Sequence, residues 1–268
     1  MIIPQKLHQI WIGSDIIREP YFSASLACQK IHKHWDYKRW TEADILLLID
    51  THYPKYKALY LSYPHLVQRI DLAKVFIMHK FGGVYMDMDM ECLKPLDTLL
   101  LENSKHGIIF SILRVNCLDN EKFCPIVALS TGFLYKDQPY LSCGFFAAVP
   151  NHPFFLDLLR EYEKKNVKKK WYHPKTVYVS ITTGNTIVTD VVRKRWLNKS
   201  TILDSKYLEP CNTKFDCTIT DSSYAKDHLA NHWMPSSELA FIYMYTYKGY
   251  FILAFILVIL FLYYYVFQ

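Results

Sequence analysis

Two carboxylates two residues apart, Asp87 and Asp89, follow the apolar run Val84-Tyr85-Met86, which predicts a short strand. In a strand, residues two apart point to the same face, so both side chains would project together. Facing carboxylates repel unless a cation lies between them, and hard oxygen ligands favour Mg²⁺ or Mn²⁺. The pair therefore predicts a divalent cation site that also holds substrate phosphates. A lone D-x-D also occurs at solvated strand ends, so its surroundings decide between the two interpretations.

Charged residues on the preceding helix strengthen the cation-site interpretation. The apolar spacing of 66–80 predicts a helix, and Asp71 and Lys74 share one of its faces. Arg69 and Lys74 suit phosphate oxygens, whereas Asp71 suits sugar hydroxyls. The Gly82-Gly83 turn would bring the end of this helix close to the carboxylates. An ordinary salt-bridged helix face is the alternative.

The elements around these residues alternate between strand and helix. Strands are predicted at 6–12, 37–40, 84–86, 107–113 and 142–149, and helices at 21–34, 66–80, 153–162 and 183–196, with a further helix capped by Thr41. This alternation predicts an α/β sandwich. At the carboxyl end of a strand, the two aspartates would occupy the usual ligand crevice of such a sheet.

Composition sets the class of protein. Of 268 residues, 51% are apolar and 16% aromatic, so a packed core is expected. Lys and Arg total 31 against 25 Asp and Glu, and this formal charge of +6 does not call for nucleic acid as a partner.

The C-terminal stretch 250–267 carries no charged residue and reads as a single-pass transmembrane helix. At 18 residues it would be roughly 27 Å long, enough for a thin bilayer. We therefore predict a catalytic domain over 1–240, a juxtamembrane linker over 241–249 and a C-terminal membrane anchor. A buried core helix is the alternative, and the side of the membrane on which the domain lies stays open.

The cysteines leave the compartment open as well. Seven cysteines without a C-x-x-C pair disfavour a zinc ribbon. Cys211 and Cys217 are spaced for a small disulfide loop, but free buried thiols fit the sequence equally well.

The motifs together resemble glycosyltransferase family 32. The resemblance is carried by residues 3–11, the helix with Arg69 and Asp71, the run 82–89, the run 144–155, residues 182–185 and His232-Trp233. It covers most of 3–233, and the combination is far more specific than the D-x-D motif alone. Within the family, the inositol phosphoceramide mannosyltransferase type is the most similar.

The resemblance implies a GT-A type, Rossmann-like nucleotide-sugar-binding fold. It also implies retaining transfer of a hexose, mannose favoured, from a nucleoside diphosphate sugar to a lipid-linked or glycan acceptor, inositol phosphoceramide being one candidate. GDP-mannose is the favoured donor, with a UDP-hexose behind it, and Mn²⁺ or Mg²⁺ is the expected cofactor. An endomembrane of the Golgi or ER type is the implied location.

The same resemblance implies roles for individual residues. The implied catalytic residues are Asp71, Asp87 and Asp89; the donor-binding residues are Trp11, Arg69, Asp71, Lys74, Gly83 and Asp87; and the metal ligands are Asp87, Asp89 and His232. Trp11 would lie beside the nucleotide base. His232 would bind metal or diphosphate, unless it is a surface histidine beside Trp233.

Two positions depart from the family pattern. Lys74 stands where relatives usually carry Arg, which keeps the charge but loses the bidentate fork. Met90 stands where the ceramide-type enzymes often extend the acidic motif. These departures permit a second hypothesis, a membrane-tethered, metal-dependent carbohydrate-binding protein without turnover. A phosphohydrolase is a third, which would usually need more carboxylate or histidine ligands.

Overall fold

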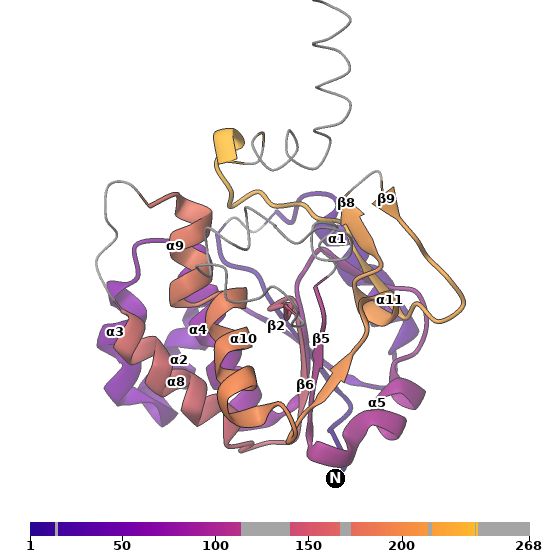
Figure 1. Cartoon of the computed structure of the whole chain (residues 1–268), viewed down its shortest axis with the longest axis horizontal. Coiled ribbons are helices and arrows are strands. Elements are labelled where there is room, and N and C mark those ends of the chain that lie inside the picture. The colour runs from indigo at the N-terminus through magenta and orange to yellow at the C-terminus, as the bar shows by residue number, and fades with distance from the viewer. Residues whose placement is uncertain (14–15, 114–139, 167–172, 214–215, 239, 241–268) are drawn as a thin grey trace, which may run out of the picture.

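The chain folds into three layers, with a mixed β-sheet between two groups of helices (Figure 1). The computed structural model describes residues 1–13, 16–113, 140–166, 173–213, 216–238 and 240. The strands are β1 (Lys6–Ile10), β2 (Asp36–Trp40), β3 (Gly83–Met86), β4 (Met90–Cys92), β5 (Ile108–Ser111), β6 (Phe145–Ala148), β7 (Thr201–Leu203), β8 (Cys211–Thr213), β9 (Asp216–Cys217) and β10 (Ala225–Asp227). The helices are α1 (Tyr21–Ile31), α2 (Glu42–His52), α3 (Lys57–Ser62), α4 (Leu66–Phe81), α5 (Asp97–Asn103), α8 (Phe154–Lys165), α9 (Lys175–Thr182), α10 (Asn185–Val191) and α11 (Ser205–Leu208), with short turns η1 (Pro54–Tyr56), η2 (Ser104–His106) and η3 (Val192–Trp196).

The main sheet has six strands in the order β2-β1-β3-β6-β5-β7. β1 runs parallel to both β2 and β3, whereas β6 is antiparallel to β3 and β5. The edge strand β7 is parallel to β5. Two small antiparallel sheets, β4-β10 and β8-β9, complete the strands of the described residues. β3 therefore lies inside the main sheet and leads directly into the D-x-D motif.

Two hydrophobic cores cover the two faces of the main sheet. α2, α4, α8 and α10 pack on one face, and α1, α5 and α11 lie on the other (Figure 1). Along β3 the side chains alternate: Tyr85 belongs to the first core, whereas Val84 and Met86 belong to the second. Because both faces are covered, the central strands read as continuous apolar runs rather than alternating ones.

Gly82 and Gly83 allow the chain to turn sharply from α4 into β3. Gly82 has a φ of 60°, and a Cβ there would lie 2.5 Å from the backbone nitrogen of Pro150. Gly83 has a φ of 90°, and its Cβ would lie 2.7 Å from the carbonyl oxygen of Lys6. Only glycine fits such close backbone contacts at positive φ. The two glycines thus set how closely α4 and the D-x-D motif approach each other.

The predicted α/β architecture is confirmed, and so are the main elements predicted from the sequence. Thr41 caps α2 as expected: its Oγ1 accepts from the Asp44 N–H, and the Asp44 carboxylate accepts from the Thr41 N–H. The single helix predicted at 183–196 is instead divided between α10 and η3.

Within the described part of the chain, no helix is long and apolar enough to cross a membrane. The predicted linker over 241–249 and the predicted anchor over 250–267 lie outside the described residues, so both stay predictions.

Candidate active site

The D-x-D motif lies in a tight turn rather than in a strand. β3 ends at Met86 and β4 begins at Met90, and the Met90 N–H donates to the Asp87 carbonyl at 3.0 Å. The sequence argument from strand alternation was therefore wrong about the local structure. Asp87 and Asp89 are nevertheless partly exposed, whereas Met86, Met88 and Met90 are buried. The turn thus keeps the methionines in the core and leaves both carboxylates toward the surface.

Met90, at the position where the sequence departs from the family pattern, lies between the core and the site. Its side chain is fully buried and packs in the core that also contains Met86 and Phe145. Its Sδ also lies beside the site, because a Cβ at Gly144 would be 3.4 Å from Met90 Sδ and 3.4 Å from Asp87 Oδ2.

Lys74 joins Asp71 and Asp87 beneath the turn. Its Nζ lies 3.2 Å from Asp71 Oδ1, 3.1 Å from Asp87 Oδ1 and 3.1 Å from the Cys143 carbonyl oxygen. Burial alone would lower the pKa of Lys74, but the carboxylates of Asp87 and Asp71 raise it well above its usual value. Tyr85 also donates its hydroxyl to Asp87 Oδ1, at 2.6 Å. Asp87 is thus held through Oδ1, which leaves Oδ2 as its oxygen outside these contacts.

Asp71 is buried and its two oxygens are both engaged. Oδ1 contacts Lys74, and Oδ2 accepts a hydrogen bond from Thr183 Oγ1 at 2.9 Å. Burial raises the pKa of Asp71 to about 6 despite the opposing effect of Lys74. The contacts make Asp71 a support for the Lys74 ammonium, whereas the sequence prediction had it hold sugar hydroxyls.

A distant segment of the chain closes over Asp89. The Ala230 N–H donates to Asp89 Oδ2 at 3.1 Å, and the His228 N–H donates to the Asp89 carbonyl at 3.0 Å. This segment follows β10, which pairs with β4 so that Asp227 lies opposite Met90. The restraint on Asp89 therefore comes from residues about 140 positions further along the chain.

Two further carboxyl groups, Asp227 and Glu209, lie near the D-x-D pair, and sequence reasoning missed both. Burial and the neighbouring Asp89 raise the pKa of Asp227 well above its usual value. Burial also raises the pKa of Glu209 to about 8, with added effects of Asp87 and Asp89. In turn, burial and Asp87 raise the pKa of Asp89. Neither Asp227 nor Glu209 belongs to a recognisable sequence motif. The pairing of β10 with β4 places Asp227 near the D-x-D pair, and the position of α11 does the same for Glu209.

An aromatic row borders the acidic residues. Trp11 packs on Tyr21 with ring centroids 5.2 Å apart, and Tyr21 packs on His232 at 5.4 Å. The Tyr21 hydroxyl also hydrogen-bonds His232 Nδ1 at 2.8 Å. Burial, with Asp89 and Asp87 nearby, raises the pKa of Tyr21 to about 12. Trp11 and His232, 221 residues apart in the sequence, therefore lie on the two sides of one tyrosine beside the carboxylates.

The remaining predicted residues lie elsewhere or act through the backbone. The Arg69 guanidinium is 3.3 Å from Glu42 on α2, so its salt bridge leads away from the D-x-D turn. Gly83 contributes its backbone conformation at the start of β3. His228 points its Nε2 at Glu91, 2.7 Å away, and not at Asp89.

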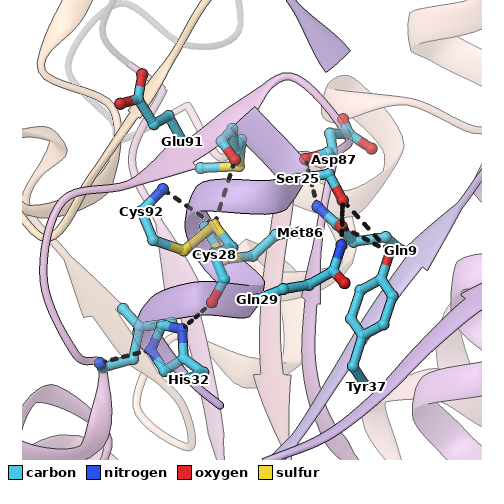
Figure 2. The surroundings of a disulfide bond; sticks show 12 residues. Gln9, Ser25, Cys28, Gln29, His32, Tyr37, Met86, Asp87, Glu91 and Cys92 are labelled. Atoms are coloured by element: carbon cyan, nitrogen blue, oxygen red, sulfur yellow. Dashed lines mark hydrogen bonds between the residues drawn. A yellow bond between two sulfur atoms is a disulfide. The ribbon is translucent and has the colours of Figure 1, made fainter. Parts of the chain in front are cut away.

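A disulfide links α1 to the strand that follows the D-x-D turn (Figure 2). Cys28 on α1 is bonded to Cys92 on β4, three residues after Asp89. Nearby, Ser25 donates to Gln9 Oε1 at 2.6 Å, and Gln9 Nε2 lies 3.5 Å from the Asp87 carbonyl oxygen. Figure 2 shows Gln9 and Ser25 between the disulfide and Asp87. The turn is thus tied covalently to α1 and by hydrogen bonds to β1.

The structure also gives the bonding state of the other described cysteines. Cys211 and Cys217 form a second disulfide, one of the two alternatives that the sequence left open, and Cys143 is free and buried. The partner of Cys28 could not be read from the sequence, because the spacing of cysteines does not fix their pairing.

The carboxyl groups suit a hard divalent cation in their chemistry. Asp71 and Asp87 contact the Lys74 ammonium, and Asp89, Glu209 and Asp227 lie near enough to Asp87 to interact with it electrostatically. Glu209 Oε2 is buried without a hydrogen-bond partner in the described part of the chain. However, no three His, Cys, Asp or Glu side chains of the described residues already enclose a metal position. The set thus fits an ion that takes ligands from two carboxylates and the rest from water and phosphate.

Comparison with known proteins agrees with this arrangement. Residues 23–105 match the family described as the glycosyltransferase sugar-binding region containing the DXD motif. Inositol phosphoceramide mannosyltransferase 1 of Schizosaccharomyces pombe is 28% identical over 66% of this chain and 48% of its own length. A mannosyl phosphorylinositol ceramide synthase of Saccharomyces cerevisiae is 28% identical over 80% of this chain and 49% of its own. The chain thus spans about half the length of these two relatives.

A viral relative and a solved structure match over more of their lengths. An uncharacterised glycosyltransferase of Acanthamoeba polyphaga mimivirus is 28% identical over 90% of this chain and 88% of its own. The crystal structure of mouse xyloside xylosyltransferase 1 has a TM-score of 0.50 and 12% identity, covering 84% of this chain and 97% of that one. This likeness shows the mixed α/β fold found in GT-A glycosyltransferases. The family match and the curated relatives show that the chain is similar to the DXD-containing glycosyltransferases of family 32.

Proposed function

We propose that the protein transfers a hexose, with mannose favoured, from a nucleoside diphosphate sugar to a lipid-linked or glycan acceptor. Inositol phosphoceramide is the favoured acceptor, because the fungal relatives are named for mannosyl transfer to that class of lipid. GDP-mannose is the favoured donor and a UDP-hexose the alternative. The observation that carries the proposal is the pair Asp87 and Asp89, held at the end of β3 beside three further carboxyl groups and a buried lysine.

In this proposal Asp87 and Asp89 hold Mn²⁺ or Mg²⁺, and His232 is the third candidate ligand. The bound ion would neutralise the charge that develops on the leaving diphosphate. Lys74 fixes the orientation of Asp87, and the backbone N–H groups of His228 and Ala230 fix that of Asp89. Trp11 and Tyr21 offer an aromatic surface for the nucleotide base. Transfer with retention of configuration follows from the family resemblance, and no residue is assigned as a covalent nucleophile.

The proposed location is an endomembrane of the Golgi or ER type, with the anchor predicted at 250–267. Two disulfides, Cys28–Cys92 and Cys211–Cys217, support placing the domain on the oxidising, lumenal side.

A panel of nucleotide sugars assayed for Mn²⁺-dependent nucleotide release tests the donor. We expect GDP-mannose to be cleaved fastest, and Asp89→Asn to lower the rate by at least about 100-fold. Asp89→Asn keeps the acceptor for the Ala230 N–H and removes only the charge. When vesicles that contain inositol phosphoceramide are added, the hexose should be transferred to this lipid and no longer to water. Binding of a nucleotide sugar without any release would instead support the carbohydrate-binding alternative.

A further inference from the structure

Glu209 is a buried carboxyl group with one unsatisfied oxygen. Its side chain is fully buried, Oε1 accepts from Ser142 Oγ at 2.6 Å, and Oε2 has no hydrogen-bond partner among the residues that the structure describes. It directly follows α11, and its N–H closes that helix by donating to the Ser205 carbonyl at 2.7 Å. The hydrogen bond from Ser142 therefore fixes the position of Oε1.

A short chain of contacts links Glu209 to Asp87. Ser142 Oγ, which donates to Glu209, accepts from the Gly144 N–H at 3.0 Å, and the Gly144 carbonyl accepts from the Asp87 N–H at 2.8 Å. A methyl group at Gly144 would lie 3.3 Å from Ser142 Oγ and 3.4 Å from Asp87 Oδ2. Ser142 Oγ and Asp87 Oδ2 thus flank the same small space. Glu209 is thus linked to Asp87 through Ser142 and Gly144.

The unsatisfied oxygen makes a purely structural role for Glu209 costly. A buried polar atom without a partner destabilises the fold by about 1–3 kcal/mol. Three other carboxyl groups, those of Asp87, Asp89 and Asp227, lie near enough to interact with it electrostatically. An apolar side chain of similar size would avoid both costs. Among the described residues Oε2 has no hydrogen-bond partner, which leaves it available to a partner from outside the protein.

We propose that Glu209 is an outer carboxylate of the cation site, whose Oε2 accepts a hydrogen bond from a water bound to the divalent ion. The inference rests on the proposed function only in taking Asp87 and Asp89 as the inner ligands. Mg²⁺ and Mn²⁺ normally keep several of their waters, and these waters donate hydrogen bonds. Groups that hold such outer positions typically strengthen metal affinity 10- to 100-fold. Glu209 is thus a positioning residue and does not touch the transferred sugar.

Mn²⁺ titration followed by electron paramagnetic resonance, without any donor sugar, tests the proposal. We expect Glu209→Gln to weaken Mn²⁺ binding about 10- to 100-fold. We expect its unfolding temperature without metal to be equal to or above that of the wild type, because a costly buried acid is removed. Glu102→Gln is the matched control: it makes the same chemical change at an exposed position on α5 and should leave Mn²⁺ affinity unchanged.

The possible results distinguish a wrong role for Glu209 from the absence of a metal site. Wild-type affinity in Glu209→Gln, alongside a loss in Asp89→Asn, would overturn the role of Glu209 and keep the metal site. No Mn²⁺ binding by the wild type would overturn the metal site instead. If Glu209→Gln does not fold, Ser142→Ala replaces it. This variant keeps the carboxyl group but frees Oε1, and a several-fold loss of affinity supports the proposal, whereas unchanged affinity refutes it.

Discussion

The Lys74 ammonium lies 3.1 Å from the Asp87 carboxylate while only 4% of the lysine is exposed. It also contacts Asp71, so one buried cation holds two buried or half-buried acids in place. Removing one member of such a group is costly, because its partners are left charged in a low-dielectric environment.

Lys74→Met is therefore expected to lower the free energy of unfolding by about 3 kcal/mol, measured by urea denaturation. Adding Asp71→Asn should restore part of this loss, because the stranded acid is removed. The matched control is Lys38→Met, which breaks the exposed pair with Asp44 and should cost less than about 1 kcal/mol. Equal losses in the two single variants would contradict a buried role for Lys74.

Tyr21 is expected to hold His232 in a working position. Tyr21→Phe keeps the ring that packs on Trp11 and removes the hydroxyl bonded to His232 Nδ1. We expect kcat/KM for donor cleavage to fall about fivefold, the value of one ordinary hydrogen bond. The double variant with His232→Ala should lose little more than His232→Ala alone. Fully additive losses would show that the two residues act independently.

His8 gives the fold a dependence on pH. Its Nε2 lies 3.0 Å from the Gly82 carbonyl oxygen, and its Nδ1 accepts from Trp40 Nε1 at 3.2 Å, so the ring is neutral. Burial lowers the pKa of His8 from 6.5 to about 4, against the effect of the Gly82 hydrogen bond. Between these values the unfolded chain binds a proton that the folded protein does not. Stability is therefore complete above about pH 6.5 and falls as the pH drops toward 4.

His8→Gln is expected to remove the part of this slope due to His8, about 3 kcal/mol over the whole window. The slope due to His32, His79 and His152, whose pKa values burial also lowers, should remain. Urea unfolding at pH 7, 6 and 5 measures the slope. His52→Gln, at an exposed position in the last turn of α2, should keep the slope of the wild type. A His8→Gln variant that loses stability with acid as steeply as the wild type would assign the effect to other groups.

The Cys28–Cys92 disulfide is expected to stabilise the domain by about 2–4 kcal/mol. Replacing both residues with serine should lower the free energy of unfolding by that amount and loosen the D-x-D turn. The same change at Cys211 and Cys217 should cost less, because it opens a loop of 6 residues and not 64. Peptide masses under non-reducing conditions check the pairing, and a free Cys28 thiol would refute it.

Local signals in the sequence predicted the fold well but the site only in part. The apolar spacing of 66–80 and the Gly82-Gly83 turn gave α4 and β3, because both depend on neighbouring residues. The D-x-D pair was found for the same reason, although it lies in a turn. Glu209 and Asp227 carry no local signal, since long-range strand pairing and the placement of α11 bring them to the site. The Cys28–Cys92 pairing was likewise hidden by a separation of 64 residues.

The residues that hold Asp89 in place lie in a different part of the chain from the strands of the main sheet. All six strands of the main sheet lie before residue 204, whereas the N–H groups that bond Asp89 belong to His228 and Ala230. A protein shortened to residue 220 would keep the residues of every main-sheet strand, but it would lose β10, the buried Ala225 and the two N–H groups that bond Asp89. A change that disables the site can therefore lie about 140 residues away from the D-x-D motif in the sequence.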